Sequence, residues 1–466
     1  IQSMIMNQVR TRIAPSPTGE DLHIGNLYTG LINWVMARKY EGKFIIRIED
    51  TDRTRFVEGA TEKILDSLKK FHIFYDEGPD IGGPYAPYYQ SQRLSIYHEY
   101  AQKLIDSGHA EFAYYPKEGA GKKKDYTQAI ESSESKDESG QSSPKSIEEM
   151  ITRGDWVVRQ IIPKNEKVIV HDLIRGDIEF DTNELSKQVL IKSDGYPTYH
   201  LGVVVDDYLM KISHIIRAEE WISSTPKHVL LYKAFGWELP IFAHLPILRN
   251  PDRSKLSKRK NPVWVSWYID EGYLPQAVVN FLALLGWSHP EEKEIFSVDE
   301  FTAAFELKDI KPIGPVFDLT KLTWMNGIYI REVLSHEELQ NALYVYDPTL
   351  KEIDGVLLKK LIEVAKTRIK TLKEFKLMIM PFLYPEERHL DKEQKELLDA
   401  MVMELQKISV WDQASISDVI LQNFIQTKRV NFKALYMMLI NTDKGLPLAD
   451  TFAAIGKEKT LALFHE

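Results

Sequence analysis

The strongest constraint on the fold is a change of hydrophobic period that occurs twice near the N-terminus. Residues 9–14 alternate weakly, as a strand does, and end in the turn-forming run Pro-Ser-Pro-Thr-Gly at 15–19. Residues 27–40 then carry apolar side chains at helical spacing. A second apolar run over 44–48 leads to a helical face at 64–68. Strands that alternate with helices predict an α/β fold with a parallel sheet.

The α/β pattern is interrupted in the middle of the chain. Residues 94–107 are typical of a helix, whereas 119–146 are rich in Lys, Ser, Glu and Gly and predict an exposed, mobile connection. Strand-like runs at 156–162 and 168–170 predict a small β-containing insertion. A buried strand is expected at 212–216, where the α/β pattern resumes.

The last part of the chain is expected to be helical. After about Leu334 the sequence has no convincing strand pattern, and the apolar positions within 357–365 form one stripe. This indicates a separate helical region.

Composition narrows the class of protein. The chain has 466 residues, 44% hydrophobic and 27% charged, close to globular averages, and contains no cysteine. Disulfides and thiolate zinc sites are therefore excluded. No apolar run approaches the ~20 residues that a membrane span needs, and the cytosol is the expected location. A net charge of −9 means that any nucleic-acid partner must meet a locally basic surface.

The first group of residues with chemical potential lies at the expected strand-to-helix turn. His23 and Gly25 follow the turn at 15–19 and begin the helix. Backbone N–H groups at a helix start favour an anion, His23 can donate to phosphate, and Gly25 leaves room for a flat base. Taken alone, a histidine here is more often part of an ordinary loop.

The second group is a compact cationic run at 253–260. Lys255 and Lys258 can neutralise the charge that develops when an oxyanion attacks the α-phosphate of ATP. Taken alone, such a run is more often a solvated face.

The third group is dispersed over expected strand ends, where open α/β sheets bind ligands. Its members are Arg12, Glu49, Tyr199, Arg217, Glu219, Glu220 and Trp221. An arginine offers a rigid donor fork for a carboxylate, and Glu49 can pair with an ammonium group, which would suit an amino acid. Ion pairs among these side chains are the alternative.

Together these stretches resemble the glutamyl-tRNA synthetase family, a bacterial-type branch of the class I aminoacyl-tRNA synthetases. Residues 12–25 resemble the glutamyl form of the HIGH motif, and 255–259 resemble KMSKS. Further similar stretches lie at 47–52, 76–79, 193–199, 217–221 and 316–319. The resemblance covers nearly the whole chain and weakens at 119–146 and over the last hundred or so residues.

The resemblance implies a glutamate–tRNA ligase. Such an enzyme activates L-glutamate with ATP and Mg²⁺ to glutamyl-adenylate, a step that needs bound tRNA, and transfers glutamate to the 3′ end of tRNA(Glu). The catalytic residues would be His23, Lys255 and Lys258. The ATP site would comprise Thr18, His23, Gly25, Glu220, Lys255 and Lys258. The glutamate site would comprise Arg12, Ser16, Glu49, Tyr199, Arg217 and Trp221.

Two arginines around the substrate side chain would exclude glutamine, because a neutral amide leaves a buried guanidinium without its counter-charge. Three departures from the family pattern stand out. Asn26 replaces the last histidine of HIGH and receives no role, and Val203 stands where some members have an asparagine near the substrate. The thiolate zinc site of some members is absent, so no zinc is expected.

The resemblance also implies a domain organisation. We expect a Rossmann-type catalytic domain in two halves (1–92 and 191–250), an inserted tRNA acceptor-binding domain (93–190), a KMSKS loop and stem-contact domain (251–333), and an all-helical anticodon-binding region (334–466). Arg368 matches an arginine that reads the last anticodon base in some members. We expect the protein to act as a monomer and not to bind a membrane.

Three other functions share some of these features. Glutaminyl-tRNA synthetases share the ATP motifs, but the amino-acid sequence at 14–19 and the paired arginines favour glutamate. A shorter relative that glutamylates a modified tRNA base lacks the helical region after Leu334. A catalytically dead paralogue that binds RNA would be expected to lose His23, Lys255 and Lys258, which are all present.

Overall fold

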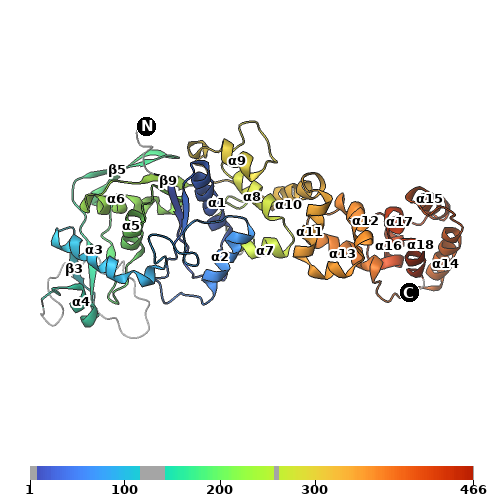
Figure 1. Cartoon of the computed structure of the whole chain (residues 1–466), viewed down its shortest axis with the longest axis horizontal. Coiled ribbons are helices and arrows are strands. Elements are labelled where there is room, and N and C mark those ends of the chain that lie inside the picture. The colour runs from blue at the N-terminus through green and yellow to red at the C-terminus, as the bar shows by residue number, and fades with distance from the viewer. Residues whose placement is uncertain (1–7, 116–141, 257–261, 465–466) are drawn as a thin grey trace. The chain divides into compact units, whose positions relative to one another are not determined.

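The computed structural model describes residues 8–115, 142–256 and 262–464 (Figure 1). The chain divides into two compact units: Ile1–Ser266 with Val279–Phe317, and Trp267–Val278 with Asp318–Glu466. Most of the expected connection at 119–146 lies outside the described residues.

The first unit begins with the parallel strand pair that the sequence predicts. β1 (Arg10–Ile13) pairs in parallel with β2 (Lys43–Ile46), and α1 (Ile24–Lys39) connects them. A parallel pair requires such a crossover, because the chain must return to the same end of the sheet. α2 (Ala60–Lys70) follows and buries the predicted apolar face at Ile64, Leu65 and Leu68.

A four-stranded sheet carries much of the rest of this unit. Its order is β6 (Gly176–Asp181), β5 (Lys167–Asp172), β9 (Ile241–Leu245) and β8 (His214–Ala218). β5 and β8 run parallel to β9, whereas β6 returns antiparallel to β5. The carboxyl ends of β5, β8 and β9 therefore share one edge, where ligands bind in open α/β sheets.

The two sheets of the α/β core meet where β8 begins. The backbone N–H of Ser213 donates to the carbonyl of Arg10 at 3.0 Å, and the Arg10 N–H donates to the Ser213 hydroxyl at 2.8 Å. β1 and the start of β8 are thus neighbours. Two helices, α5 (Tyr199–Leu209) and α6 (Thr225–Ala234), pack against each other beside this core.

Residues 167–181 form two strands of the four-stranded sheet, a partnership that the sequence did not predict. The run at 168–170 was expected in the insertion, but β5 pairs with β9 and takes β6 with it into the four-stranded sheet. Hydrophobic period reveals a strand but not its partner, and β9 lies far along the chain.

A separate antiparallel sheet consists of β3 (Ala110–Tyr114), β4 (Trp156–Gln160) and β7 (Val189–Ile191). α3 (Leu94–Asp106) and α4 (Ile147–Arg153) accompany it, and the core between them includes Trp156, which is fully buried. The boundaries 93 and 190 remain predictions.

Other helices in this part of the chain are short. The α-helices are α7 (Val265–Asp270), α8 (Pro275–Ala283) and α9 (Val298–Ala304). The 3₁₀ turns are η2 (Gln90–Gln92), η4 (Thr182–Glu184), η5 (Glu219–Ser224) and η6 (Leu307–Asp309). Among them η5 matters most, because it follows β8 directly and presents Glu220 and Trp221.

The second unit is helical, as predicted: no described residue after Leu334 belongs to a strand. Its α-helices are α10 (Leu319–Ile328), α11 (His336–Tyr346), α12 (Gly355–Lys366), α13 (Leu372–Leu383), α14 (Lys392–Gln406), α15 (Gln413–Asp418), α16 (Phe432–Ile440), α17 (Leu448–Ile455) and α18 (Lys457–Ala462). Single-turn and π segments are η7 (Tyr329–Val333), η8 (Pro348–Glu352) and η9 (Val419–Gln426).

Local sequence explains where several of these helices begin. Ser335 with Glu338 opens α11, and Asp391 with Gln394 opens α14, each through a reciprocal capping box. The predicted stripe in α12 is buried at Leu358, Leu361 and Ile362. Across the described ranges, no helix is both long and apolar enough to span a membrane.

Candidate functional site

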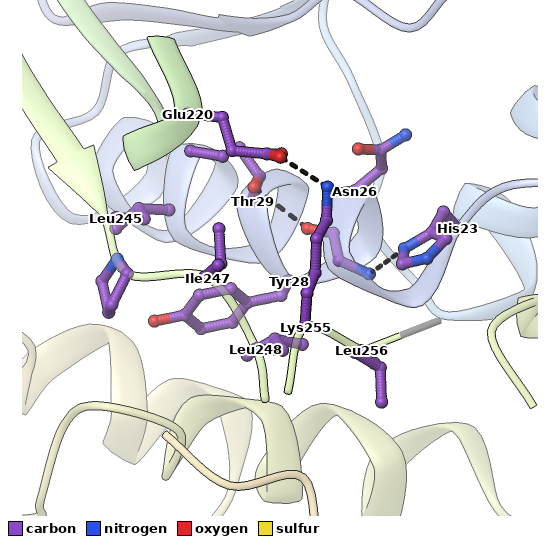
Figure 2. Close-up of a pocket in the computed structure, with 13 residues that line it drawn as sticks. His23, Asn26, Tyr28, Thr29, Glu220, Leu245, Ile247, Leu248, Lys255 and Leu256 are labelled. Carbon is purple, nitrogen blue, oxygen red and sulfur yellow. Dashed lines mark hydrogen bonds and ion pairs between the residues drawn. The ribbon is translucent and has the colours of Figure 1, made fainter. Parts of the chain in front are cut away.

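Residues from separate predicted groups meet around one cavity of about 320 Å³ (Figure 2). His23 and Gly25 come from the start of α1, Glu220 from η5, and Lys255 from the cationic run. Residues 245–248, at the end of β9 and after it, add apolar side chains. The arrangement pairs an apolar wall, which suits a flat base, with a helix start and a cation, which suit phosphates.

The start of α1 is organised by His23. His23 is the N-cap, and its Nδ1 accepts from the backbone N–H of Gly25 at 3.0 Å (Figure 2). A side-chain acceptor at this position satisfies one of the unpaired N–H groups of the first turn. Because Nδ1 is the acceptor, the proton of a neutral His23 ring lies on Nε2.

Lys255 reaches the cavity from a short bridge. Its backbone pairs with Arg249, and Leu256 N donates to the carbonyl of Leu248 at 3.1 Å. The Lys255 ammonium forms an ion pair with Glu220 across the cavity (Figure 2). Two further predictions for ATP are not placed here: Thr18 does not line the cavity, and Lys258 lies outside the described residues.

The chain on the far side of the cationic run is joined to the start of α1. His23 pairs with Trp264, and the Ile24 N–H donates to the carbonyl of Val263 at 2.7 Å. Asp21 strengthens this link, because its carboxylate accepts from the Ser266 N–H at 2.8 Å. Residues 263–266, which follow the cationic run in sequence, therefore lie beside the HIGH-like stretch.

Arg217, at the end of β8, is buried among neutral acceptors. Its Nη1 donates to the Tyr199 hydroxyl at 3.0 Å, its Nη2 to the Thr225 hydroxyl at 2.8 Å, and its Nε to Nε2 of His244 at 3.1 Å. His228 Nδ1 lies 3.4 Å from Nη1. The side chain is only 5% exposed, and no carboxylate of the described residues forms an ion pair with it. Its charge is thus uncompensated.

The histidines around Arg217 are held in their neutral form. Burial, assisted by the charge of Arg217, lowers the pKa of His228 well below its usual value. Burial and the nearby Lys227 and Arg217 lower the pKa of His200 to about 3. Burial also lowers the pKa of His244, although Asp172 opposes the effect.

Arg12 has the opposite surroundings. Its Nε and Nη2 donate to both carboxylate oxygens of Asp207 on α5, at 3.0 and 2.9 Å. Arg47, which is fully buried, donates to the same carboxylate at 2.7 Å. Burial alone would lower the pKa of Arg12, but Asp207 outweighs it, and the pKa is raised. The alternative reading of the third group, ion pairing, therefore applies to Arg12, with a partner that the sequence analysis did not name.

Glu49 lies beside this network. It is 8% exposed and accepts from Arg47 Nη2 at 3.2 Å. Burial raises the pKa of Glu49 to about 7, and Arg47 and Arg12 oppose the shift. Near neutral pH this carboxyl group is therefore close to its titration point.

Tyr199 connects the two arginine environments. Burial raises its pKa, and its hydroxyl lies within electrostatic reach of Arg217, Glu49 and Arg12. Its ring packs on that of Trp221 with a centroid distance of 4.0 Å. Ser16 is exposed and follows Pro15, whose carbonyl accepts from the Glu49 N–H at 3.1 Å. The predicted glutamate residues thus gather at one place.

Arg368 lies in the second unit, just after α12. It lines a cavity of about 330 Å³ whose other members include Phe432, Tyr436 and Asp450. An exposed arginine beside aromatic rings suits an unstacked base. Its assigned role stays a prediction.

The sequence analysis missed Asp207, Asp172, His228 and His244. A signal was present for two of them. Asp207 follows an apolar stretch at 203–205, and His244 lies inside the apolar strand β9. A charged or polar side chain in a segment with no polar face is buried, and therefore needs a partner.

Comparison with known proteins identifies two families in this chain. Residues 8–324 match the family "tRNA synthetases class I (E and Q), catalytic domain", and 335–463 match "Anticodon binding domain". A glutamate–tRNA ligase of Thermus thermophilus is 42% identical, over 97% of this chain and 98% of its own length. That of Marinomonas sp. strain MWYL1 is 40% identical, over 97% and 94%.

A solved structure is also similar. It is a glutamate tRNA ligase from Elizabethkingia meningosepticum CCUG26117 in complex with its amino acid, with a TM-score of 0.80 and 31% identity. The match covers 98% of this chain and 99% of that chain.

Proposed function

The chain belongs to the class I tRNA synthetases specific for glutamate or glutamine, and we propose that it is a glutamate–tRNA ligase. It activates L-glutamate with ATP and transfers the amino acid to the 3′ end of tRNA(Glu). Relatives named glutamate–tRNA ligase that match over nearly the whole chain support the choice of glutamate. The anticodon-binding family over 335–463 supports tRNA as the partner.

The choice of glutamate as the substrate rests on the surroundings of Arg217, which is buried among neutral acceptors. A buried guanidinium that meets only neutral acceptors has lost hydration and has not gained a counter-charge. The side-chain carboxylate of glutamate provides that charge, and Glu49 provides a partner for the ammonium group. Glutamine has the same shape but no charge, so it would leave Arg217 uncompensated.

The reaction has two steps. An oxygen of the glutamate α-carboxylate attacks the α-phosphorus of ATP, the bond to the β-phosphate oxygen breaks, and pyrophosphate leaves. A terminal ribose hydroxyl of tRNA then attacks the acyl carbon, and AMP departs. No protein nucleophile is required, so the protein contributes positioning and charge stabilisation.

The nucleotide cavity supports the assignment of ATP. In the proposal His23 and Lys255 act on the phosphates, Gly25 lets the base approach, and Lys258 joins them. Bound together with the nucleotide, Mg²⁺ would withdraw charge from the phosphate oxygens. Such an ion is held mainly by phosphates and water, so few protein ligands are needed. Accordingly, we rest no step on a dedicated protein site for it.

The ion pair between Lys255 and Glu220 bears on this mechanism. Both side chains are about half exposed, so the pair is weak and phosphates can replace the carboxylate. In the proposal Lys255 moves to the phosphates when ATP binds, and Glu220 becomes available to the nucleotide. We further propose that the protein acts as a monomer in the cytoplasm and that glutamate activation requires bound tRNA.

The test is charging of tRNA(Glu) and tRNA(Gln) transcripts with labelled glutamate, with labelled glutamine in parallel. Glutamate on tRNA(Glu) alone identifies a discriminating enzyme, and glutamate on both identifies a non-discriminating one. Attachment of glutamine, or no charging, overturns the proposal.

Two variants test individual roles. Replacing Lys258 with Ala should reduce adenylate formation much more than glutamate affinity; equal activity would remove its assigned role. Replacing Arg368 with Ala should relax the selectivity between the two tRNAs. Unchanged relative charging would remove Arg368 from anticodon reading.

A further inference from the structure

Two chains of hydrogen bonds lead away from Arg217, and both consist of neutral groups where they meet the guanidinium. In the first, Arg217 Nε donates to His244 Nε2, and His244 Nδ1 lies 2.6 Å from Asp172 Oδ2. In the second, Arg217 Nη1 faces His228 Nδ1, and His228 Nε2 lies 3.1 Å from His200 Nδ1. The donors of the arginine therefore determine the orientation of both rings.

The geometry determines the tautomers. A guanidinium can only donate, so His244 Nε2 must be an acceptor and the His244 proton must lie on Nδ1, directed at Asp172. By the same argument His228 accepts at Nδ1 and donates from Nε2 to His200. A second proton on either ring would point an N–H at the guanidinium. The two histidines therefore accept hydrogen bonds from Arg217, and protonation of either ring is unfavourable.

Asp172 is the carboxylate nearest to Arg217 along these chains, and it is already occupied. Its Oδ1 accepts from the N–H groups of Ile174 and Arg175, each at 3.0 Å. Its Oδ2 accepts from both the backbone and the ring of His244. The imidazole stands between it and the guanidinium. Asp172 thus holds His244 in one tautomer and does not pair directly with Arg217.

We infer that the neutral shell of His228, His244 and Thr225 is the specificity determinant that makes this site select a charged substrate side chain. The inference rests on the proposed function and deepens it. A carboxylate in the shell would neutralise Arg217 internally, so that glutamate would lose its advantage over glutamine. A neutral acceptor leaves that advantage to the substrate.

The test is a matched pair of variants that differ in charge alone. His228→Asn keeps a neutral acceptor near the position of Nδ1, whereas His228→Asp places a carboxylate there. Both are assayed by pyrophosphate exchange with ATP and tRNA(Glu), with glutamate and with glutamine as substrates. We expect the glutamate-to-glutamine ratio of kcat/KM to be at least 100-fold lower in His228→Asp than in His228→Asn, mainly through a higher KM for glutamate.

A purely structural role for His228 predicts a different result, since both variants would then reduce activity with the two substrates in parallel. Ratios that agree within threefold between the variants overturn the inference. If His228→Asp does not fold, the pair Thr225→Asp and Thr225→Asn applies the same test at the Nη2 side of the guanidinium. Thr225 is fully buried, so the introduced charge remains close to Arg217.

The unmodified protein distinguishes a failure of the proposed function from a failure of the inference about the neutral shell. If it activates no glutamate, the proposed function fails. If it activates glutamate and the charge pair leaves the ratio unchanged, only the role of the neutral shell fails.

Discussion

The two arginines assigned to the substrate occupy contrasting surroundings. Arg12, on β1, is neutralised by Asp207 through two hydrogen bonds and shares that carboxylate with Arg47. Arg217, on β8, donates to a tyrosine, a threonine and a histidine and has no acid of the described residues as its partner. Both are buried, so hydration does not account for the difference.

This difference suggests different roles for the two arginines: Arg12 orients the ligand, and Arg217 selects its charge. A neutralised arginine can still direct a donor at a ligand, but it gains little from the charge of that ligand. An uncompensated arginine gains most of its stabilisation from that charge. The motif resemblance treats Arg12 and Arg217 as equals, whereas their partners differ, and we therefore propose that Arg217 is the main charge selector.

The largest expected effect comes from removing the uncompensated charge. Arg217→Gln should lower kcat/KM for glutamate by about 1000-fold, about 4 kcal/mol, because the substrate carboxylate loses its counter-charge. Its thermal unfolding temperature should change little, since no ion pair is broken. Arg12→Gln is the comparison and should destabilise, because Asp207 loses one of its cations. Equal destabilisation by the two changes would contradict the contrast.

The second-largest effect tests Asp207, the counter-charge of Arg12. Asp207→Asn should lower the free energy of unfolding by about 3 kcal/mol, since Arg12 becomes buried without its counter-charge, whereas Arg47 keeps Glu49 and Asp206. The KM for glutamate should also rise as Arg12 loses its orientation. The measurement is urea denaturation followed by tryptophan fluorescence, with steady-state kinetics.

Asp206→Asn is the matched control. Asp206 is equally buried, accepts from Arg93 and from Tyr97 at 2.7 Å, and lies 3.6 Å from Arg47 Nε, so it shares Arg47 with Asp207, whereas the hydrogen bonds of Arg12 go to Asp207. It should destabilise without a specific rise in the KM for glutamate. If both variants raise that KM alike, Asp207 has no special role.

A smaller effect concerns pH. Glu49, with its pKa raised to about 7, faces Arg47, Arg12, Asp207 and Tyr199. As pH falls below 7, Glu49 gains a proton and can no longer pair with an ammonium group. The kcat/KM for glutamate should therefore fall about tenfold between pH 8 and pH 6. Near Arg217, burial lowers the pKa of His200 to about 3 and also lowers the pKa values of His228 and His244, so these histidines shift away from this pH range.

Glu49→Gln provides the control for the pH profile. It should have a lower kcat/KM throughout and lose the dependence between pH 6 and pH 8. A flat profile in the unmodified protein would show that Glu49 is already ionised and that Arg47 outweighs burial.

The smallest effect concerns Tyr199, a further neutral acceptor of Arg217 outside the neutral shell. Tyr199→Phe removes one acceptor from Arg217, which keeps Thr225 and His244, so the KM for glutamate should rise about fivefold, or about 1 kcal/mol. Tyr232→Phe is the control, because the Tyr232 hydroxyl is buried without a hydrogen-bond partner among the described residues. A similar rise in both variants would indicate a general packing effect.

The sequence predicted the α/β class, the helical region and most members of the site, because hydrophobic period and short motifs are local properties. Arg12 and Arg217 were found through motif wording, and Lys255 through local charge. Their partners were not found, since a hydrogen bond between Arg12 and Asp207 depends on how α5 packs beside β1. The same limit left the partner of the strands at 167–181 unpredicted, because β9 is distant in the chain.

Because the partners of the first strand are distant in sequence, they also determine when this strand can reach its final structure during translation. Arg12 emerges from the ribosome 195 residues before Asp207, and the backbone partner of Arg10 at Ser213 comes 203 residues later. At ~5 to 20 residues per second, the first strand waits about 10 to 40 s for both. Until then Arg12 must stay solvated, because burial without a counter-charge is costly. The glutamate site is therefore completed late in synthesis, and the N-terminal portion cannot fold to its final form ahead of the rest.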